Sequence, residues 1–187
     1  MPPAGQLSPN ILRHKVIHMM YLARKYEANQ TREHWRALAV AYLDASERLC
    51  QDMVNGSWPP SYDHGQPALW LAFHATEVFL KACINPIPRK QIDNLHSLGE
   101  LLVVFNSKFP SLTFDPPFGI EPMRADPSII NMAIEHDGSL HQQLRYPVDN
   151  KNAPWPPADR GFSPTLFLGE LQRLRSDFER VSNAVFS

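Results

Sequence analysis

The stretch WLAFHATEVFLKACI, from Trp70 to Ile84, is the most apolar long segment of the chain and contains no Gly or Pro to interrupt a helix. Its apolar residues are not confined to one narrow stripe, which is typical of a helix surrounded by other helices. Three polar residues, His74, Glu77 and Lys81, are spaced so that they project from one side at successive turns. We therefore predict a central helix with one polar line.

The totals of the chain favour one domain without a strong overall charge. Its 187 residues are enough to bury a core, and 18 Lys and Arg against 19 Asp and Glu give a net charge of -1. Such a balance provides no global basic field for nucleic acid or an anionic membrane. Residues 1–8 resemble a disordered start rather than a signal peptide, and no apolar run approaches the roughly 18 residues of a membrane span. We expect a soluble cytoplasmic protein, with Cys50 and Cys83 in its core.

Capping residues and helical spacing predict two helices before the central one. Ser8-Pro9 begins a helix over about residues 9–28, and Thr31 caps a second helix that ends at Asn55-Gly56. We expect the second helix to pack through a face rich in small residues, formed by Trp35, Leu38, Ala41, Tyr42, Ala45, Leu49 and Met53. A loop then runs from Trp58 to Gly65, and Pro67 lies in the first turn of the central helix.

The second half of the chain alternates helices with two proline-rich loops. Ser97-Leu98-Gly99-Glu100 is a capping box that opens a helix. Residues 109–127 and 148–164 are proline-rich, and the first of these loops has several Phe residues to bury; Pro127 can start a short helical segment between them. Ser163-Pro164 repeats the start seen at Ser8-Pro9 and opens the clearest amphipathic helix, whose apolar residues are Leu171, Leu174, Phe178, Val181 and Val185.

The polar line on the central helix has two interpretations. Glu77 and Lys81 stand in the favourable acid-before-base order four residues apart, which contributes only about 0.3–0.5 kcal/mol on an exposed helix. On a largely apolar helix the pair is expected to be partly buried, where removal of one partner costs roughly 3–5 kcal/mol. The pair is either a structural buried ion pair or part of a polar cleft with His74.

Other polar residues are candidates for binding an anion. His96 lies just outside a predicted helix N-terminus, where free amides and the helix dipole favour phosphate. Arg145 beside Tyr146 provides a cationic fork and an aromatic surface for a base. No metal or other cofactor is expected. The densest cluster of potential metal ligands does not have the spacing of a zinc motif; its members are Glu135, His136, Asp137 and His141.

Three short motifs, in this order, resemble the HEPN family, whose name stands for higher eukaryotes and prokaryotes nucleotide-binding. They are Glu77-x-x-x-Lys81-Ala82 on a hydrophobic helix, His96-Ser97-Leu98 opening a helix, and Arg145-Tyr146-Pro147. The resemblance covers about residues 31–186. It implies an all-α, antiparallel four- to six-helix bundle, usually a homodimer, in bacterial toxin–antitoxin, defence or nucleotide-related systems.

The resemblance leads to three functional expectations. The first is a protein that binds a nucleotide or RNA phosphate through His74, Glu77, Lys81, His96, Arg145 and Tyr146. The second is a metal-independent endoribonuclease toxin, because many members use an arginine and a histidine separated by four to six residues, and Arg89 and His96 satisfy that spacing. The third is a non-catalytic dimerisation or partner-binding module, with an antitoxin or another protein as partner. No membrane partner is expected.

Overall fold

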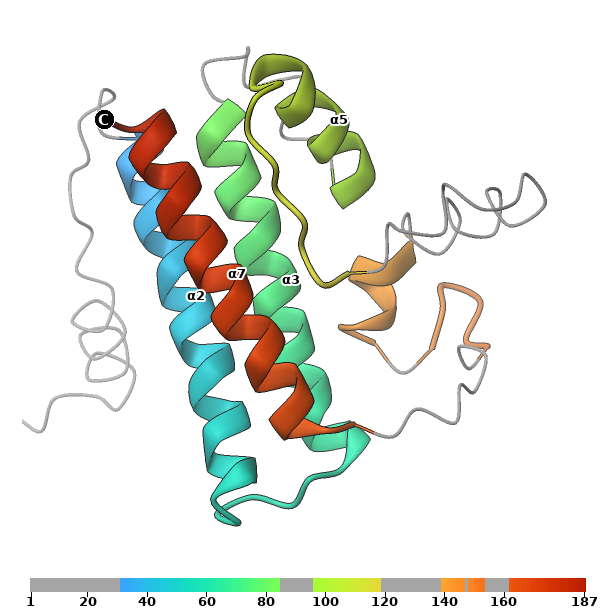
Figure 1. Ribbon diagram of the computed structural model, residues 1–187. Helices are drawn as coiled ribbons and strands as arrows, with labels where there is room; N and C mark the ends of the chain where they lie inside the picture. Colours follow the sequence, from blue (N-terminus) through green and yellow to red (C-terminus); the bar gives the residue numbers. More distant parts are fainter. Residues whose placement is uncertain (1–30, 85–95, 119–138, 147, 154–161) are drawn as a thin grey trace, which may run out of the picture. The chain divides into compact units, whose positions relative to one another are not determined.

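The computed structural model describes residues 31–84, 96–118, 139–146, 148–153 and 162–187. These residues are mostly helical and include no β-strand, which confirms the all-α class. Their helices are α2 (Thr31–Val54), α3 (Tyr62–Ile84), α5 (Leu98–Lys108) and α7 (Pro164–Val185), with residues 139–143 forming a short helical segment (Figure 1). The predicted start at 1–8 and the predicted helix at 9–28 lie outside the described residues.

The predicted helix ends agree with the structure at three places. Ser97 caps α5, and its hydroxyl accepts a hydrogen bond from the Glu100 amide at 3.2 Å. Ser163 caps α7 in the same way, with Pro164 in the first turn. Helix α2 ends at Val54, and Gly56 takes a φ of +75°, a left-handed conformation that costs glycine little. These ends depend on local hydrogen bonds, which sequence patterns report well.

The predicted start of the central helix is wrong. Helix α3 begins at Tyr62, so the preceding loop is shorter than expected and Pro67 lies inside the helix. Ser61 explains the earlier start, because its hydroxyl accepts a hydrogen bond from the His64 backbone amide at 3.4 Å and its carbonyl accepts the Gly65 amide at 2.9 Å. A capped first turn of this kind extends the helix ahead of the proline.

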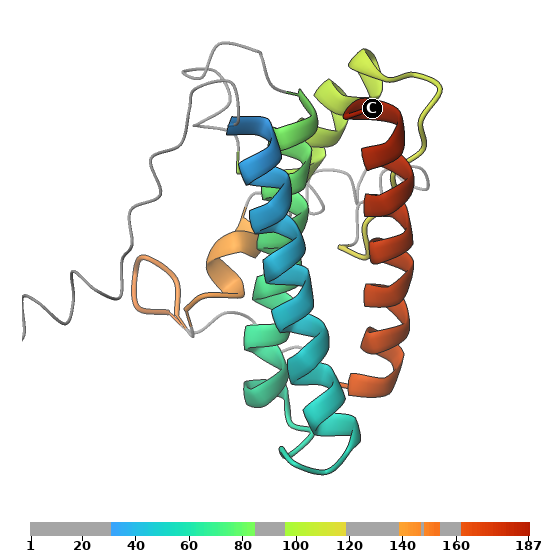
Figure 2. The same ribbon diagram turned by 90° about the vertical axis from the view of Figure 1, so that its left-hand side faces the viewer.

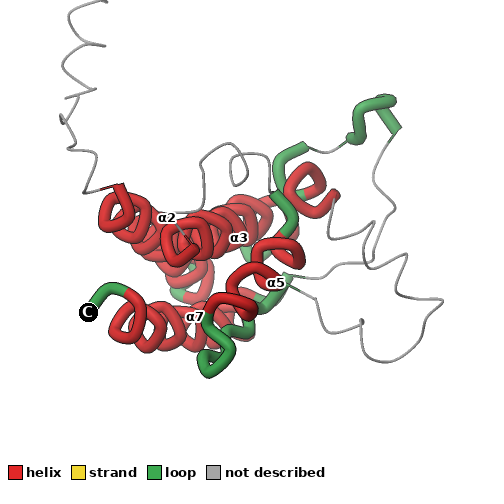
Figure 3. Tube along the Cα trace, turned by 90° about the horizontal axis from the view of Figure 1, so that it is seen from above, coloured by secondary structure: helices red, strands yellow, loops and turns green. Residues whose placement is uncertain are grey.

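Helices α2 and α3 run antiparallel. Arg32 Nε, at the start of α2, donates to the Ala82 carbonyl near the end of α3. Ser46 Oγ, further along α2, donates to the Ala68 carbonyl near the start of α3, at 2.8 Å. Helix α7 lies beside both of them, antiparallel to α2 and in the same direction as α3 (Figure 2). Seen end on, α2, α3 and α7 form a group of three (Figure 3).

Helix α5 departs from the antiparallel pattern that we expected. His96, just before α5, contacts Glu77 in the middle of α3, whereas Lys108 at the end of α5 contacts the Ile84 carbonyl at the end of α3. Helix α5 therefore runs in the same direction as α3, on the side of α3 away from α2 (Figures 1 and 3).

The first proline-rich loop contributes to the core in its described part. Residues 109–118 run back along α3, where Phe114 packs against Phe79 at 5.7 Å and Phe118 packs against Phe73 at 5.5 Å between ring centroids. Both loop rings are buried. In this described part of the loop, Phe114 and Phe118 are therefore buried, as the sequence led us to expect for its Phe residues. Residues 119–127 and 154–161, which hold the rest of both loops, lie outside the described residues.

The face of α2 that packs on its neighbours agrees only in part with the predicted one. Trp35, Tyr42 and Leu49 are half-buried and pack against the core, but most of the fully buried residues lie outside the predicted face. The buried residues are Ala39, Leu43, Ser46, Cys50 and Met53. Of the predicted face only Met53 is buried, and Leu38 is 46% exposed. Helix α2 has small or apolar residues on two sides, so periodicity alone could not choose between them. Packing decides which side of α2 is buried, because the buried Ser46 hydroxyl donates a hydrogen bond to the Ala68 carbonyl of α3.

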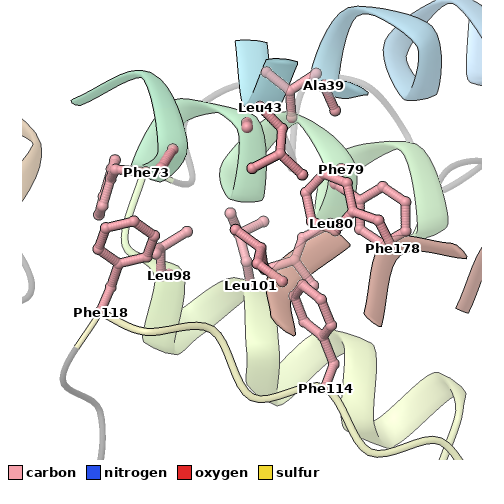
Figure 4. Packing of buried hydrophobic residues seen from close by; sticks show 14 of the residues in the cluster. Ala39, Leu43, Phe73, Phe79, Leu80, Leu98, Leu101, Phe114, Phe118 and Phe178 are labelled. Carbon is pink, nitrogen blue, oxygen red and sulfur yellow. The ribbon is translucent and has the colours of Figure 1, made fainter. Parts of the chain in front are cut away.

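The core is centred on α3. It combines residues of α2, α3, α5 and α7 with Phe114 and Phe118 of the loop and with Leu140 and Leu144. Figure 4 shows this packing for Leu43, Phe79, Leu101 and Phe178. Helix α3 is long and apolar enough to cross a membrane by length and composition, but 72% of its most apolar window is buried inside the protein. A buried core helix meets the same criteria, so this feature is weak evidence for a membrane span.

Candidate functional site

One carboxylate, that of Glu77, joins three polar side chains. Lys81 Nζ donates to Glu77 Oε1 at 2.8 Å, and His96 Nδ1 lies 3.0 Å from the same oxygen. His74 Nδ1 lies 3.4 Å from the other oxygen, Oε2. We call these four residues the Glu77 cluster. Because an ionised carboxylate can only accept hydrogen bonds, each imidazole donates through Nδ1, and in the neutral ring Nε2 is then an acceptor.

The Glu77 carboxyl is ionised although it is buried. Burial by itself raises its pKa, but the hydrogen bonds from His74 and Lys81, the charge of Lys81 and the hydrogen bond from His96 together lower the pKa to about 2. The side chains of Glu77 and Lys81 are each only 8% exposed. Lys81 is therefore neutralised by Glu77 rather than presented to solvent as a separate cation.

Two aromatic rings hold His74 in place. The Trp70 ring stacks on the imidazole, with centroids 5.3 Å apart and an interplanar angle of 9°. The Tyr42 ring of α2 meets the same imidazole edge-on at 4.8 Å. Trp70 precedes His74 by one helical turn, so this stack follows from α3 itself. The contact with Tyr42 depends on the packing of α2 against α3.

His96 is the most accessible member of the Glu77 cluster. Its side chain is 55% exposed, compared with 30% for His74. Its position follows from Ser97, which caps α5 and so places the preceding residue beside α3. The ring of His141 lies against it, with centroids 5.9 Å apart at an angle of 25°. Two imidazoles thus lie side by side at the exposed edge of the cluster.

Arg145 and Tyr146 lie next to the cluster through Trp70. The Arg145 guanidinium carbon is 5.8 Å from the Trp70 ring centroid and 5.5 Å from that of Tyr146, both within cation–π range. Gln66 of α3 fastens this segment by donating to the Gln143 carbonyl at 2.9 Å. Arg145 and Tyr146 are both exposed, so the segment adds an accessible cation and an accessible ring.

Two sets of contacts bring the predicted site residues together. His74, Glu77, Lys81 and His96 share one carboxylate, and Arg145 reaches them through the Trp70 ring, with Tyr146 beside it. Arg89 lies outside the described residues, as do the three acidic and histidine residues at 135–137.

Sequence reasoning missed three residues of this site: Tyr42, Trp70 and His141. The spacing of Trp70 one turn before His74 was a usable signal. The other two contacts join segments far apart in the chain, and no local pattern reports them.

Comparison with known proteins leaves the family open. No family model, no curated protein and no solved structure matches the chain. The function is therefore inferred from the geometry of the site and from the sequence resemblance.

Proposed function

We propose that this chain is a cytoplasmic HEPN-like helical-bundle protein that binds a nucleotide or an RNA phosphate at the Glu77 cluster and Arg145. The observation that carries the proposal is the shared carboxylate, which holds two imidazoles in fixed orientation beside a stacked arginine. The resemblance adds a bacterial toxin–antitoxin or defence setting, a homodimer and an antitoxin or other protein partner to the proposal.

The charges of the site assign different roles to its cations. Lys81 is paired with Glu77 and orders the carboxylate. Arg145 is exposed, contacts rings, and is the residue suited to hold phosphate, with Tyr146 as a stacking surface for a base. His96 presents Nε2 as an acceptor for a ribose hydroxyl, or as a donor when protonated. The proposed ligand therefore combines an anionic group with a base or sugar.

A thermal-shift titration with nucleotides and short single-stranded RNA tests this function. We expect the melting temperature to rise with ligand concentration, because a ligand that binds only the folded state stabilises it. Arg145→Ala should weaken binding about tenfold, the loss expected for roughly 1.4 kcal/mol. Arg48→Ala is the matched control, because Arg48 is exposed on α2 and pairs only with Asp52 in the described chain. If none of these ligands shifts the wild-type melting temperature, the proposal is wrong.

One observation favours endoribonuclease activity as a second candidate. His96 is half exposed, and Glu77 orients its ring by a hydrogen bond to Nδ1, an arrangement suited to proton transfer through Nε2. This candidate requires cleavage of RNA in the presence of a chelator, with loss of cleavage in His96→Ala and Arg89→Ala. RNA that stays intact at high protein concentration excludes it.

The third candidate is a partner-binding module in which the Glu77 cluster is only structural. The burial of Glu77 and Lys81 at 8% exposure is the observation in its favour. In that case Glu77→Gln lowers the melting temperature, while nucleotide and RNA have no effect on either protein.

A further inference from the structure

A second group of cations surrounds the C-terminal end of α3. Arg32 of α2 donates through Nε to the Ala82 carbonyl at 3.2 Å, and Lys108 of α5 donates through Nζ to the Ile84 carbonyl at 3.0 Å. Arg36 lies one turn after Arg32 on the same helix. Arg32 and Lys108 therefore meet the end of α3 from two helices, about two turns, or roughly 10 Å, beyond Glu77. Arg36 adjoins Arg32 over the ring of Phe186.

The ring of Phe186 supports the two arginines of this group. The guanidinium carbon of Arg32 is 4.8 Å from the ring centroid, and that of Arg36 is 5.2 Å from it. Stacking on a ring orients a guanidinium while leaving most of its N–H donors available. Both arginines are half-buried and Lys108 is exposed.

This group differs from the other arginines of the described helices in its lack of acidic partners. Arg48, Arg173, Arg175 and Arg180 each form an ion pair with a carboxylate. Within the described ranges, no carboxylate lies at ion-pair distance from Arg32, Arg36 or Lys108. Among the described residues, their partners are two backbone carbonyls and the rings of Phe186 and Phe109. A helix C-terminus carries only about half a negative charge.

Repulsion within the group is visible at Lys108. The pKa of its ammonium is lowered, first by partial burial and then by the nearby charge of Arg32, while Cys83 acts in the opposite direction. A cation that is repelled by its neighbours gains most from a bound anion. Among the described residues, no acidic side chain balances this group, which makes it suited to bind an anion.

We propose that Arg32, Arg36 and Lys108 form a binding site for a small diphosphate-bearing molecule, separate from the Glu77 cluster. A single phosphate group carries about −1.5 to −2 charge at pH 7, so two groups are needed to balance three cations. The guanidinium forks provide paired donors for phosphate oxygens, and Lys108 provides a point charge. This site does not depend on the function proposed for the Glu77 cluster.

Inorganic pyrophosphate is the probe for this site. We expect it to raise the melting temperature of the full chain more than sodium chloride does at matched ionic strength. In the Arg36→Ala/Lys108→Ala double variant the half-saturating concentration should rise about tenfold. Arg36→Lys/Lys108→Arg keeps both charges and should retain binding, which separates loss of charge from loss of fold. Arg48→Ala should bind as the wild type does.

Three outcomes would overturn the proposal. The first is an equal shift with sodium chloride, which would mean general screening. The second is an unchanged response of the double variant. The third is loss of the response in Arg145→Ala instead, which would place the pyrophosphate at the Glu77 cluster and would support the function proposed there while removing the second site.

Discussion

One side of α3 packs through aromatic rings, whereas the other side buries an ion pair. On one side Phe79 stacks on Phe178 of α7, with ring centroids 3.9 Å apart, and also packs against Phe114. On the other side Glu77 and Lys81 form an ion pair that is buried to about the same degree as Phe114 and Phe118, the loop residues of the core. Both sides belong to the same helix, and both depend on partners from distant segments.

The two sides contribute differently to the stability of the fold. The apolar side gains free energy from every ring that it buries. A buried ion pair is often no more stabilising than apolar residues of the same size, because desolvation offsets the attraction. Stability alone therefore does not explain why α3 keeps Glu77 and Lys81. The aromatic and cationic residues around the polar side make it the part of the helix to examine for binding.

The largest expected effect comes from the apolar side. Phe79→Ala removes a fully buried ring and both of its aromatic contacts, so we expect the free energy of unfolding to fall by about 3–5 kcal/mol. Urea denaturation followed by circular dichroism measures this. Val103→Ala on α5 is the control, because Val103 is 70% exposed and its truncation should change little. A loss below about 1 kcal/mol for Phe79→Ala would contradict the central role of this packing.

On the polar side we expect a smaller loss in the free energy of unfolding, and a second substitution should restore most of it. Glu77→Gln leaves the Lys81 ammonium buried without an anion, at a cost of roughly 3 kcal/mol. Adding Lys81→Met removes the unpaired charge and should restore most of that loss, which a double-mutant cycle measures. As a comparison, Arg175→Ala breaks a surface ion pair with Glu47 and should cost about 1 kcal/mol or less. Additive losses at Glu77 and Lys81 would show that the pair is not coupled.

The smallest of these effects concerns pH. Because the pKa of Glu77 is about 2 in the folded state and 4.5 ordinarily, its stabilisation is complete above pH 4.5 and is lost as the pH falls toward 2. Between pH 7 and pH 3 the loss should be about 2 kcal/mol, at 1.4 kcal/mol per pKa unit. Denaturation at several pH values should show this slope in the wild type and a shallower one in Glu77→Gln. If stability depended on pH equally in the two proteins, the partners of Glu77 would not lower its pKa in the folded state.

Sequence patterns succeeded where the decisive contacts lie within one or two helical turns. The caps at Ser97 and Ser163, the glycine after α2 and the buried face of α7 all follow from such contacts. They failed where the structure depends on contacts that helical periodicity does not report. Helix α3 begins earlier than predicted because Ser61 caps it. Periodicity alone did not show that the helix would begin ahead of Pro67.

The spacing of His74, Glu77 and Lys81 in the sequence was enough to predict that they lie on one side of a central helix, because this spacing follows from helix geometry. The pairing of Lys81 with Glu77 and the contact of His96 with the same carboxylate arise from the folded structure. It also chose which face of α2 is buried and in which direction α5 runs. The reason is physical: helix periodicity is a property of neighbouring residues, whereas burial and pairing depend on segments brought together by packing.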